Sequence, residues 1–290
     1  MLYPKREGIM LCYPAEEKRI KKLPELFIAQ PKLNGERCRV EWYDGAPILL
    51  SSYGNEFKGL NHITTALVQF MPKGVKWDGE LYVHGWPRER IHSAVSRKKN
   101  ASDDAHSVQF HIFDYQDTEK PQIQRCADIA EWFNFTQADP VYPVLQRVNT
   151  FRSSHSEWIE HCQSCIEKGY EGIILRHPYA LYEEKRSVNC LKFKPTEHDD
   201  YTITGFNQEV DINGFAKESL GSFIVTSDEG TQFSVGTGPA LTRDRREHYW
   251  KYRHELIGHI LTVKHEALKT TNNIPIATVA VKVKDWRHFK

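Results

Sequence analysis

Apolar and polar residues alternate along several short segments in the first two thirds of the chain. Residues 37–43 read Arg-Cys-Arg-Val-Glu-Trp-Tyr, and this two-residue period predicts a strand with one buried face. An Asn-Gly pair precedes this segment and an Asp-Gly pair follows it, so residues 25–53 are predicted to form three strands joined by tight turns. Further strands are predicted at residues 75–83, 108–115, 172–175 and 190–193.

Helical spacing replaces this alternation in two segments. In residues 60–71, apolar side chains recur every three or four positions, as they do on one face of a helix. Residues 154–169 predict a better-defined helix. Ser154 and Glu157 form a capping-box pattern at its start, and Gly169 suits a C-terminal cap.

The pattern changes after Pro195, where short β-like segments follow one another with one helix predicted over residues 242–256. Such a row of short strands fits a small β-barrel of the OB-fold type. We therefore predict an α+β chain in which residues 1–195 form antiparallel sheets with flanking helices and residues 196–290 form an OB fold. The strands predicted in this second domain lie at residues 201–206, 222–226, 232–235, 260–265 and 278–284.

The composition is that of a globular protein. Of the 290 residues, 40% are hydrophobic and 27% are charged, which is enough apolar material for a core. The apolar runs are too short to span a membrane, and the N-terminal Met-Leu-Tyr-Pro-Lys-Arg lacks the apolar stretch of a secretory signal. We expect a cytoplasmic protein that does not bind membranes.

The net charge of +1 says little about partners, but the basic residues are unevenly distributed. One cluster lies at residues 88–99 and another at residues 243–246, and both are able to contact phosphates. A solvated charged surface explains either cluster equally well. The first cluster contains Arg88, Arg90, Arg97, Lys98 and Lys99.

Six cysteines are scattered along the chain, and only Cys162 and Cys165 form a CxxC pair. A tetrahedral zinc site needs four ligands, and no second pair stands at a matching spacing. The two thiols also lie three residues apart in a predicted helix, where cysteine is most often a small buried side chain. We expect a packing role for this pair.

Five short patterns follow one another in an order that suggests nucleotide chemistry. Each is ordinary alone, because Asn-Gly and Asp-Gly favour turns and the other patterns suit strands. Their joint occurrence, followed by an OB-like tail, argues against coincidence. The patterns are Lys32-Leu-Asn-Gly-Glu-Arg37, Asp78-Gly-Glu-Leu81, Phe110-His-Ile-Phe-Asp114, Glu171-Gly-Ile-Ile-Leu-Arg176 and Leu191-Lys-Phe-Lys-Pro195.

With these patterns the chain resembles the ATP-dependent DNA ligases of the covalent nucleotidyltransferase superfamily over nearly its whole length. It is most similar to the minimal ligases of phages and large DNA viruses, which consist of an adenylation domain and an OB domain. The resemblance implies that a lysine accepts AMP from ATP and passes it to the 5′-phosphate of a nick, which the 3′-hydroxyl then seals. It further implies ATP and Mg²⁺ (or Mn²⁺) as cofactors, nicked double-stranded DNA as partner, and a monomer in the bacterial or phage-infected cytoplasm.

The resemblance assigns the lysines their roles. Lys32 is expected to be the nucleophile that forms lysyl-AMP, and Lys192 and Lys194 are expected to hold the α-phosphate. These two lysines alternate with Phe193, so that both ammonium groups project to one face of their strand. Attack on phosphorus requires a neutral amine, although free lysine is protonated at neutral pH.

The remaining site residues follow from the same resemblance. Glu171 matches the metal-binding carboxylate, which suits a hard ion such as Mg²⁺. Glu80 is a second candidate metal ligand, and together with Arg37 it matches residues that bind the ribose hydroxyls. The other expected nucleotide-binding residues are Gln30 at the adenine edge, Phe113 stacked on adenine, and Leu33.

Three places depart from the family pattern. Asn34 stands where most relatives have aspartate, and Ser52 lies in a Ser-Ser-Tyr-Gly sequence where relatives have a serine-arginine motif that contacts DNA. The C-terminal Arg-x-Asp-Lys motif has only a blurred counterpart in residues 281–287. The residues expected to contact DNA are Ser52, Arg88, Arg97, Lys98, Lys282 and Lys284.

Three alternatives stay open. An RNA ligase shares the lysine chemistry, but the Gly-Ser and Val-Gly-Thr-Gly sequences of the tail resemble those of DNA ligases. An mRNA-capping guanylyltransferase also carries an OB tail but uses GTP. An inactive nucleic-acid-binding module is the third, and the joint presence of Lys32, Glu171, Lys192 and Lys194 argues against it.

Overall fold

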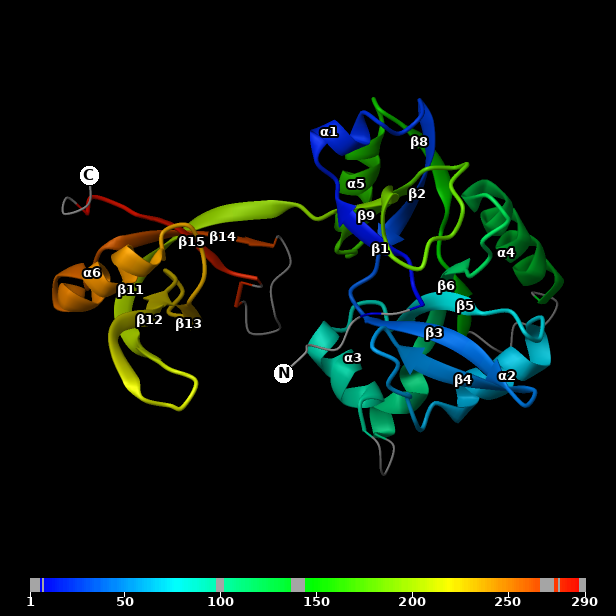
Figure 1. Ribbon diagram of the computed structural model, residues 1–290, viewed down its shortest axis with the longest axis horizontal. Helices are drawn as coiled ribbons and strands as arrows, with labels where there is room; N and C mark the ends of the chain where they lie inside the picture. The colour runs from blue at the N-terminus through cyan, green and yellow to red at the C-terminus, as the bar shows by residue number, and fades with distance from the viewer. Residues whose placement is uncertain are drawn as a thin grey trace. The chain divides into compact units, whose positions relative to one another are not determined.

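The protein is described by a computed structural model, and it divides into two compact units, Met1–Phe193 and Lys194–Lys290. The first unit combines two mixed sheets with helices, and the second is mainly antiparallel β-structure, so the predicted α+β class is confirmed (Figure 1). The described residues are 6, 8–97, 102–136, 144–266, 274–275 and 277–286.

One sheet of the first unit has the strand order β4-β3-β5-β6-β7. Its pairs are antiparallel except for β6 and β7, which run parallel and so depart from the predicted antiparallel pattern. The alternation predicted in β3 places Cys38 and Val40 in the core, where Ile63 and Leu67 of α2 join them. The elements are β3 (Glu36–Tyr43), β4 (Ala46–Ser51), α2 (Asn61–Phe70), β5 (Trp77–Tyr82), α3 (Arg88–Val95), η1 (Asp103–Ser107), β6 (Gln109–Tyr115), α4 (Gln122–Thr136) and β7 (Leu145–Arg147).

The other sheet of this unit has the order β1-β10-β9-β2-β8, and it joins the first strand of the unit to its last. Strands β1 and β10 pair in parallel, and the remaining neighbours are antiparallel. Helix α5 packs against β2 and β9. The elements are β1 (Leu11–Pro14), α1 (Glu17–Ile20), β2 (Leu26–Lys32), β8 (Phe151–Ser154), α5 (Trp158–Glu167), β9 (Gly172–Arg176) and β10 (Arg186–Phe193).

Helix α5 is shorter than the sequence predicts. Ser154 ends strand β8, and its hydroxyl donates to the Glu157 carboxylate at 2.6 Å instead of capping a helix. Gly169 follows the helix with φ of +82°, as a C-terminal glycine does. Cys162 and Cys165 are buried, as the packing role predicts.

The second unit is one antiparallel sheet with the order β13-β12-β11-β14-β15, and it is OB-like. Strand β11 is far longer than its predicted core at residues 201–206, and the predicted helix over residues 242–256 is divided into α6 and η2. The elements are β11 (Thr196–Val210), β12 (Ala216–Thr226), β13 (Gln232–Val235), α6 (Arg243–Lys251), η2 (Arg253–Leu256), β14 (Ile260–Glu266) and β15 (Val279–Val283).

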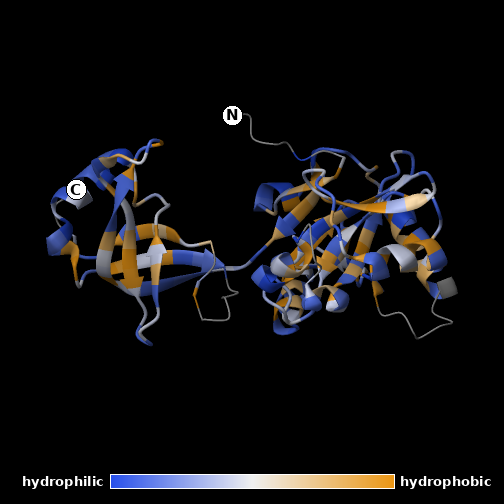
Figure 2. Ribbon diagram, turned by 90° about the horizontal axis from the view of Figure 1, so that it is seen from below, coloured by the Kyte–Doolittle hydropathy of each residue, from blue (hydrophilic) through white to orange (hydrophobic). Residues whose placement is uncertain are grey.

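Each unit buries its own apolar side chains. Phe223, Leu261 and Val263 lie in the core of the second unit, and Trp77 and Phe110 lie in the largest core of the first. Figure 2 shows the hydrophobic residues gathered on the strands of both units. No helix among the described residues is long and apolar enough to cross a membrane.

Candidate active site

Lys32 and Glu171, which are far apart in the sequence, meet where β2 ends and β9 begins. Lys32 is paired with Gly172 in the strand register, and its carbonyl accepts a hydrogen bond from the Glu171 amide at 3.0 Å. The Lys32 ammonium group forms an ion pair with the Glu171 carboxylate. The Lys32 side chain is 19% exposed and that of Glu171 is 5% exposed, so the pair lies in a shielded position that solvent reaches at the lysine.

The sheet that carries Lys32 has an apolar face, which packs beneath α5, and an opposite face with several polar side chains. Phe27, Leu175 and Leu191 belong to the cluster beneath α5, and alternate residues of a strand point to opposite sides. The polar face therefore belongs to the residues between these positions. It carries Gln30 and Lys32 of β2, Arg176 of β9, and Lys192 of β10.

Glu80 lies near this amine on β5, opposite Arg37 of β3. Burial raises the pKa of Glu80 to about 7, although the positive charges of Lys32 and Arg37 act in the opposite direction. The negative charge of Glu171 acts in the same direction as burial and raises the pKa of Glu80. Carboxylate oxygens are the ligands that Mg²⁺ prefers, and binding of a divalent cation by Glu171 and Glu80 stays a prediction.

The Arg37 side chain is held in place by neighbouring side chains of the protein. Its guanidinium group donates to both carboxylate oxygens of Asp78, at 2.6 and 2.5 Å, and the Tyr182 hydroxyl donates to the same carboxylate at 2.6 Å. Burial alone would lower the pKa of Arg37, but the Asp78 carboxylate raises it above its ordinary value. The fixed guanidinium lies 4.6 Å from the centre of the Phe113 ring, while its contact with a ribose stays a prediction.

Gln30 is equally well fixed on the polar face. Its amide nitrogen donates to the Phe113 carbonyl and to the Thr150 hydroxyl, both at 3.0 Å, and its oxygen accepts from Arg176 at 2.8 Å. Arg176 also lies 5.4 Å from the centre of the Phe113 ring. Both guanidinium groups thus contact the Phe113 ring. Adenine binding by Gln30 and Phe113 stays a prediction.

A buried charge network beneath this group was not predicted from the sequence. The Asp114 carboxylate accepts from Arg125 at 2.8 Å and from Arg176 at 3.0 Å, and Gln122 accepts from both arginines. Asp114 and Arg125 are fully buried. Arg176 and Asp114 lie within two of the five sequence patterns, but Arg125 lies in a helix whose sequence gives no signal of burial.

Comparison with known proteins assigns the chain to a family. Residues 9–194 match the family described as ATP dependent DNA ligase domain. The chain belongs to this family. It is 27% identical over 272 residues to a DNA ligase of African swine fever virus and 24% identical over 280 residues to the DNA ligase of Enterobacteria phage T4. The matches span 88% and 78% of this chain but only 62% and 57% of the relatives.

Solved ligase structures share the fold. A structure from a study of Lig E DNA ligases superposes with a TM-score of 0.76 at 23% identity, covering 96% of this chain and 99% of that one. The Chlorella virus DNA ligase-adenylate superposes with a TM-score of 0.54 at 22% identity, covering 98% and 99% of the two chains. The arrangement of elements in this ligase-family chain is therefore that of known ligases.

The other expected nucleotide-binding residues of this ligase-family protein differ in position. Leu33 is buried in a small apolar cluster, so its side chain packs inside the protein. Lys192 is half-buried on the polar face of its sheet. Lys194 lies beyond the end of β10 in the second unit, where its ammonium group lies 3.0 Å from the Glu266 carboxylate. The α-phosphate role of both lysines stays a prediction.

The residues expected to bind DNA in the first unit lie at or near the surface. Arg88 is held by the Gly35 carbonyl at 3.1 Å and by the Glu36 carboxylate at 2.8 Å. Ser52 lies in the turn after β4, and Arg97 is exposed after α3. Lys98 lies outside the described residues. No contact tests a role in DNA binding for any of them.

In the second unit, Lys282 is exposed on β15 and Lys284 forms an ion pair with Asp200. A separate group of possible metal ligands, Glu197, Asp199 and His265, has its ligand atoms within 4.8 Å of one another. Because the His265 ring lies 3.0 Å from Asp199 and 2.7 Å from the Glu266 carbonyl, protein groups already occupy both of its nitrogens.

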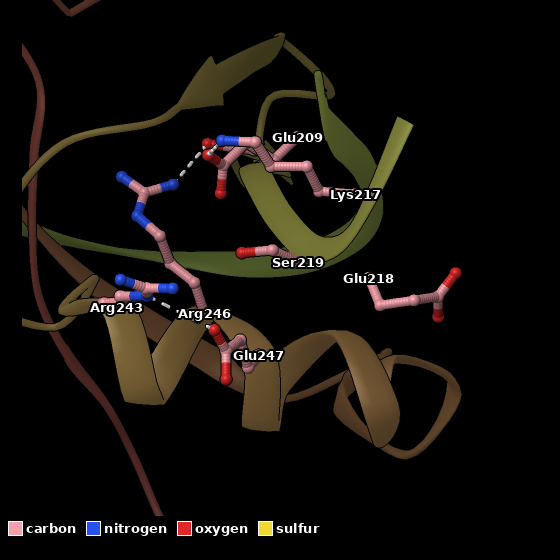
Figure 3. A pocket seen from close by; sticks show the side chains of 8 residues that line it. Glu209, Lys217, Glu218, Ser219, Arg243, Arg246 and Glu247 are labelled. Carbon is pink, nitrogen blue, oxygen red and sulfur yellow. Dashed lines mark hydrogen bonds and ion pairs between the residues drawn. The ribbon is translucent and has the colours of Figure 1, made fainter. Parts of the chain in front are cut away.

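A pocket of about 860 Å³ lies beside α6 and β12 in the second unit, and its lining carries both signs of charge. Arg243 and Glu247 point toward each other from α6 in Figure 3, at 3.5 Å, and Lys217 pairs with Glu209 at 2.7 Å. Arg246 donates to four backbone carbonyls. Arg243 and Arg246 come from the second basic cluster predicted from the sequence, and the pocket lining contains none of the residues expected to bind nucleotide or DNA.

Proposed function

We propose that the protein is an ATP-dependent DNA ligase that seals nicks between a 5′-phosphate and a 3′-hydroxyl in duplex DNA. The ion pair between Lys32 and Glu171 is the observation that carries the proposal, because it joins the nucleophile and metal-binding patterns in one site. Family membership and relatives named DNA ligase support it. The proposed partner is nicked duplex DNA, bound by a monomer in the cytoplasm of a bacterium or an infected host.

Lys32 performs the first covalent step. Its Nζ attacks the α-phosphorus of ATP, so that an N–P bond forms while the bond to the pyrophosphate oxygen breaks. The amine must give up a proton first, and a neutral amine no longer forms an ion pair with Glu171. The contact between these two side chains therefore has to loosen before the attack, and their strand register keeps them in position while it does.

The neighbouring side chains orient the nucleotide. The Phe113 ring, fixed by Arg37 and Arg176, offers a surface for the adenine ring, and Lys192 on the same sheet face offers a positive charge for the phosphate. Glu171 and Glu80 would hold Mg²⁺, which neutralises phosphate charge during the transfer. Lys194, Ser52, Arg88, Arg97, Lys98, Lys282 and Lys284 are proposed phosphate or DNA contacts.

The later steps transfer AMP from Lys32 to the 5′-phosphate of the nick, breaking the N–P bond and forming a phosphoanhydride. The 3′-hydroxyl oxygen then attacks the 5′-phosphorus. The phosphoanhydride bond breaks, and AMP leaves with the oxygen that bridged the two phosphorus atoms. Positioning and electrostatics are the main contributions of the protein to such displacements. We assign residues 1–195 to the adenylation domain and residues 196–290 to the OB domain.

The proposal is tested by incubating the full chain with ATP or GTP labelled in the α-phosphate. We expect label from ATP alone, with loss of label in Lys32→Ala and retention in Lys185→Ala, which changes an exposed lysine. A 5′-phosphorylated nick in DNA–DNA, DNA–RNA and RNA–RNA duplexes then identifies the substrate. Labelling from GTP, or sealing of RNA duplexes alone, would contradict the proposal.

A further inference from the structure

Two thiols lie in contact in a small cluster with Met10 and Tyr182, beside the sheet that carries Lys32. The sulfur atoms of Cys12, on β1, and Cys190, on β10, are 3.2 Å apart. The register of these parallel strands jumps from Ser187 to Leu191 between Cys12 and Tyr13, so the irregular segment that includes Cys190 lies beside Cys12. Cys190 is buried and Cys12 is half-buried, so Cys12 is the more exposed residue of the pair.

The surroundings make the two thiols chemically unequal. The hydrogen bond between the two sulfur atoms lowers the pKa of the Cys12 thiol to about 6, against the effect of burial. The positive charges of Arg176, Arg37 and Lys32 act in the same direction as the hydrogen bond. The same contact and burial raise the pKa of Cys190 well above its ordinary value. Cys12 is thus the thiol of the pair that ionises more readily, and the thiolate is the reactive form of cysteine.

The other four cysteines lack this environment. Burial raises the pKa of Cys162 to about 11 and raises those of Cys38, Cys126 and Cys165 above their ordinary values. Cys162 and Cys165, which form the only CxxC sequence, lie inside a core helix. The candidate pair for thiol chemistry is therefore Cys12 and Cys190, which lie far apart in the sequence.

We propose that Cys12 and Cys190 form a site of reversible oxidative modification, in which a hydroperoxide converts the two thiols into an intramolecular disulfide. The Cys12 thiolate attacks the peroxide oxygen, which breaks the O–O bond, releases water or an alcohol, and leaves a sulfenic acid. The Cys190 sulfur then attacks the Cys12 sulfur, loses its proton, and displaces water. With hydrogen peroxide, two thiols and one peroxide give one disulfide and two water molecules.

The position of the disulfide connects it to the catalytic face. Cys190 precedes Lys192 by two residues, and Pro14, which follows Cys12 by two residues, is paired with Lys192 in the register. The disulfide would tie β1 to β10 at this point and remove the thiolate charge beside Arg37 and Arg176. An effect on lysine adenylation rests on the proposed function, whereas formation of the disulfide does not.

The test treats the reduced full chain with hydrogen peroxide and maps its peptides by mass spectrometry without reduction. We expect one linked peptide pair joining Cys12 to Cys190, a loss of two hydrogen atoms from the intact mass, and full reversal by dithiothreitol. Linkage of other cysteines instead, or over-oxidation of Cys12 without a link, would overturn the proposal.

Matched variants distinguish the roles of the two sulfur atoms. Cys190→Ser should stop the reaction at the Cys12 sulfenic acid, which dimedone traps, and Cys12→Ser should leave Cys190 reduced. Cys162→Ser should form the disulfide like the wild type, and the thermal unfolding of each reduced variant establishes that it is folded. Lys32→Ala should also form the disulfide, so failure of the ligase proposal is distinguishable from failure of this one.

Discussion

At the scale of single residues, the side chains around Lys32 are positioned by charge pairs with the protein. Arg37 depends on Asp78, and Arg176 depends on Asp114. Such pairs stabilise little by themselves, because burying two charges costs nearly as much as their attraction returns, but breaking one is costly. Their main effect is to restrict the guanidinium groups to one orientation beside the Phe113 ring.

This dependence is tested by Asp78→Asn. The change leaves a mostly buried guanidinium without its ionic partner, so we expect the free energy of unfolding to fall by about 3 kcal/mol. Urea unfolding measures it, and Asp44→Asn, in an exposed turn, is the control. Labelling with ATP should also require higher nucleotide concentrations. Equal midpoints for the two variants would contradict a positioning role for Asp78.

His111 on β6 predicts a pH dependence of stability. Burial, assisted by the charge of His84, lowers the pKa of His111 to about 4. In the unfolded chain the imidazole binds a proton near pH 6.5, so the unfolded state gains protons first as the pH falls. The contribution of neutral His111 to the free energy of unfolding is therefore fully present above about pH 6.5. It is lost as the pH falls toward about 4.

The comparison is wild type against His111→Gln, with urea midpoints at several pH values between about 8 and 4. We expect the wild type to lose at most about 3 kcal/mol relative to the variant across this range. Titration of other groups is common to both proteins and cancels. Parallel stability curves would mean that His111 stays solvated enough to titrate normally.

At the scale of elements, close backbone approach in the sheet around β5 requires glycine. A Cβ atom on Gly79 would lie 2.5 Å from the His111 carbonyl oxygen and 2.6 Å from the Phe110 ring. We expect Gly79→Ala to destabilise the protein by about 2 kcal/mol, which corresponds to a melting temperature lower by about 5 °C. Scanning calorimetry measures this shift.

Gly205→Ala in β11 is the matched control, because its Cβ would meet only the Ile224 side chain, at 3.3 Å. A small change in melting temperature is expected there. A comparable decrease in both variants would show that loss of glycine, rather than the contact with β6, causes the effect. The Asp-Gly-Glu pattern would then reflect a turn preference only.

An element is predictable from the sequence when its burial leaves a pattern of apolar residues along that segment. Strand β3 was predictable because its alternate residues enter the core. The ends of β11 were missed because residues 196–200 and 207–210 face solvent and carry few apolar side chains, although pairing with β12 and β14 still extends the strand. The parallel β1–β10 pair could not be predicted, since no local signal links such distant segments.

The site shows the same difference. Lys32, Glu171 and Arg176 lie in the short sequence patterns that resemble those of ligases. The structure brings these three residues together at one sheet. Arg125 could not be predicted, because an arginine in a helix is usually solvated and its partner Asp114 lies on another element. The Cys12–Cys190 contact also depends on the unpredicted strand pair.

At the scale of the whole molecule, each unit has a separate core, which predicts separate unfolding. The clusters around Trp77 and Phe223 lie in different units. We expect two cooperative transitions in urea, and a fragment of residues 194–290 should reproduce one of them with β-sheet circular dichroism. A single transition in the full chain, with an unfolded fragment, would mean that the second unit depends on the first.

The strand order β1-β10-β9-β2-β8 also has a consequence for protein synthesis. The sheet around β5 draws its strands from residues 36–147, whereas the sheet that holds Lys32 needs strands from both ends of the first unit. During translation the former could form while β9 and β10 are still unmade. Lys32 would then meet Glu171 and Lys192 only in the last stage of that unit's synthesis, so an incomplete chain would carry Lys32 without these neighbouring side chains.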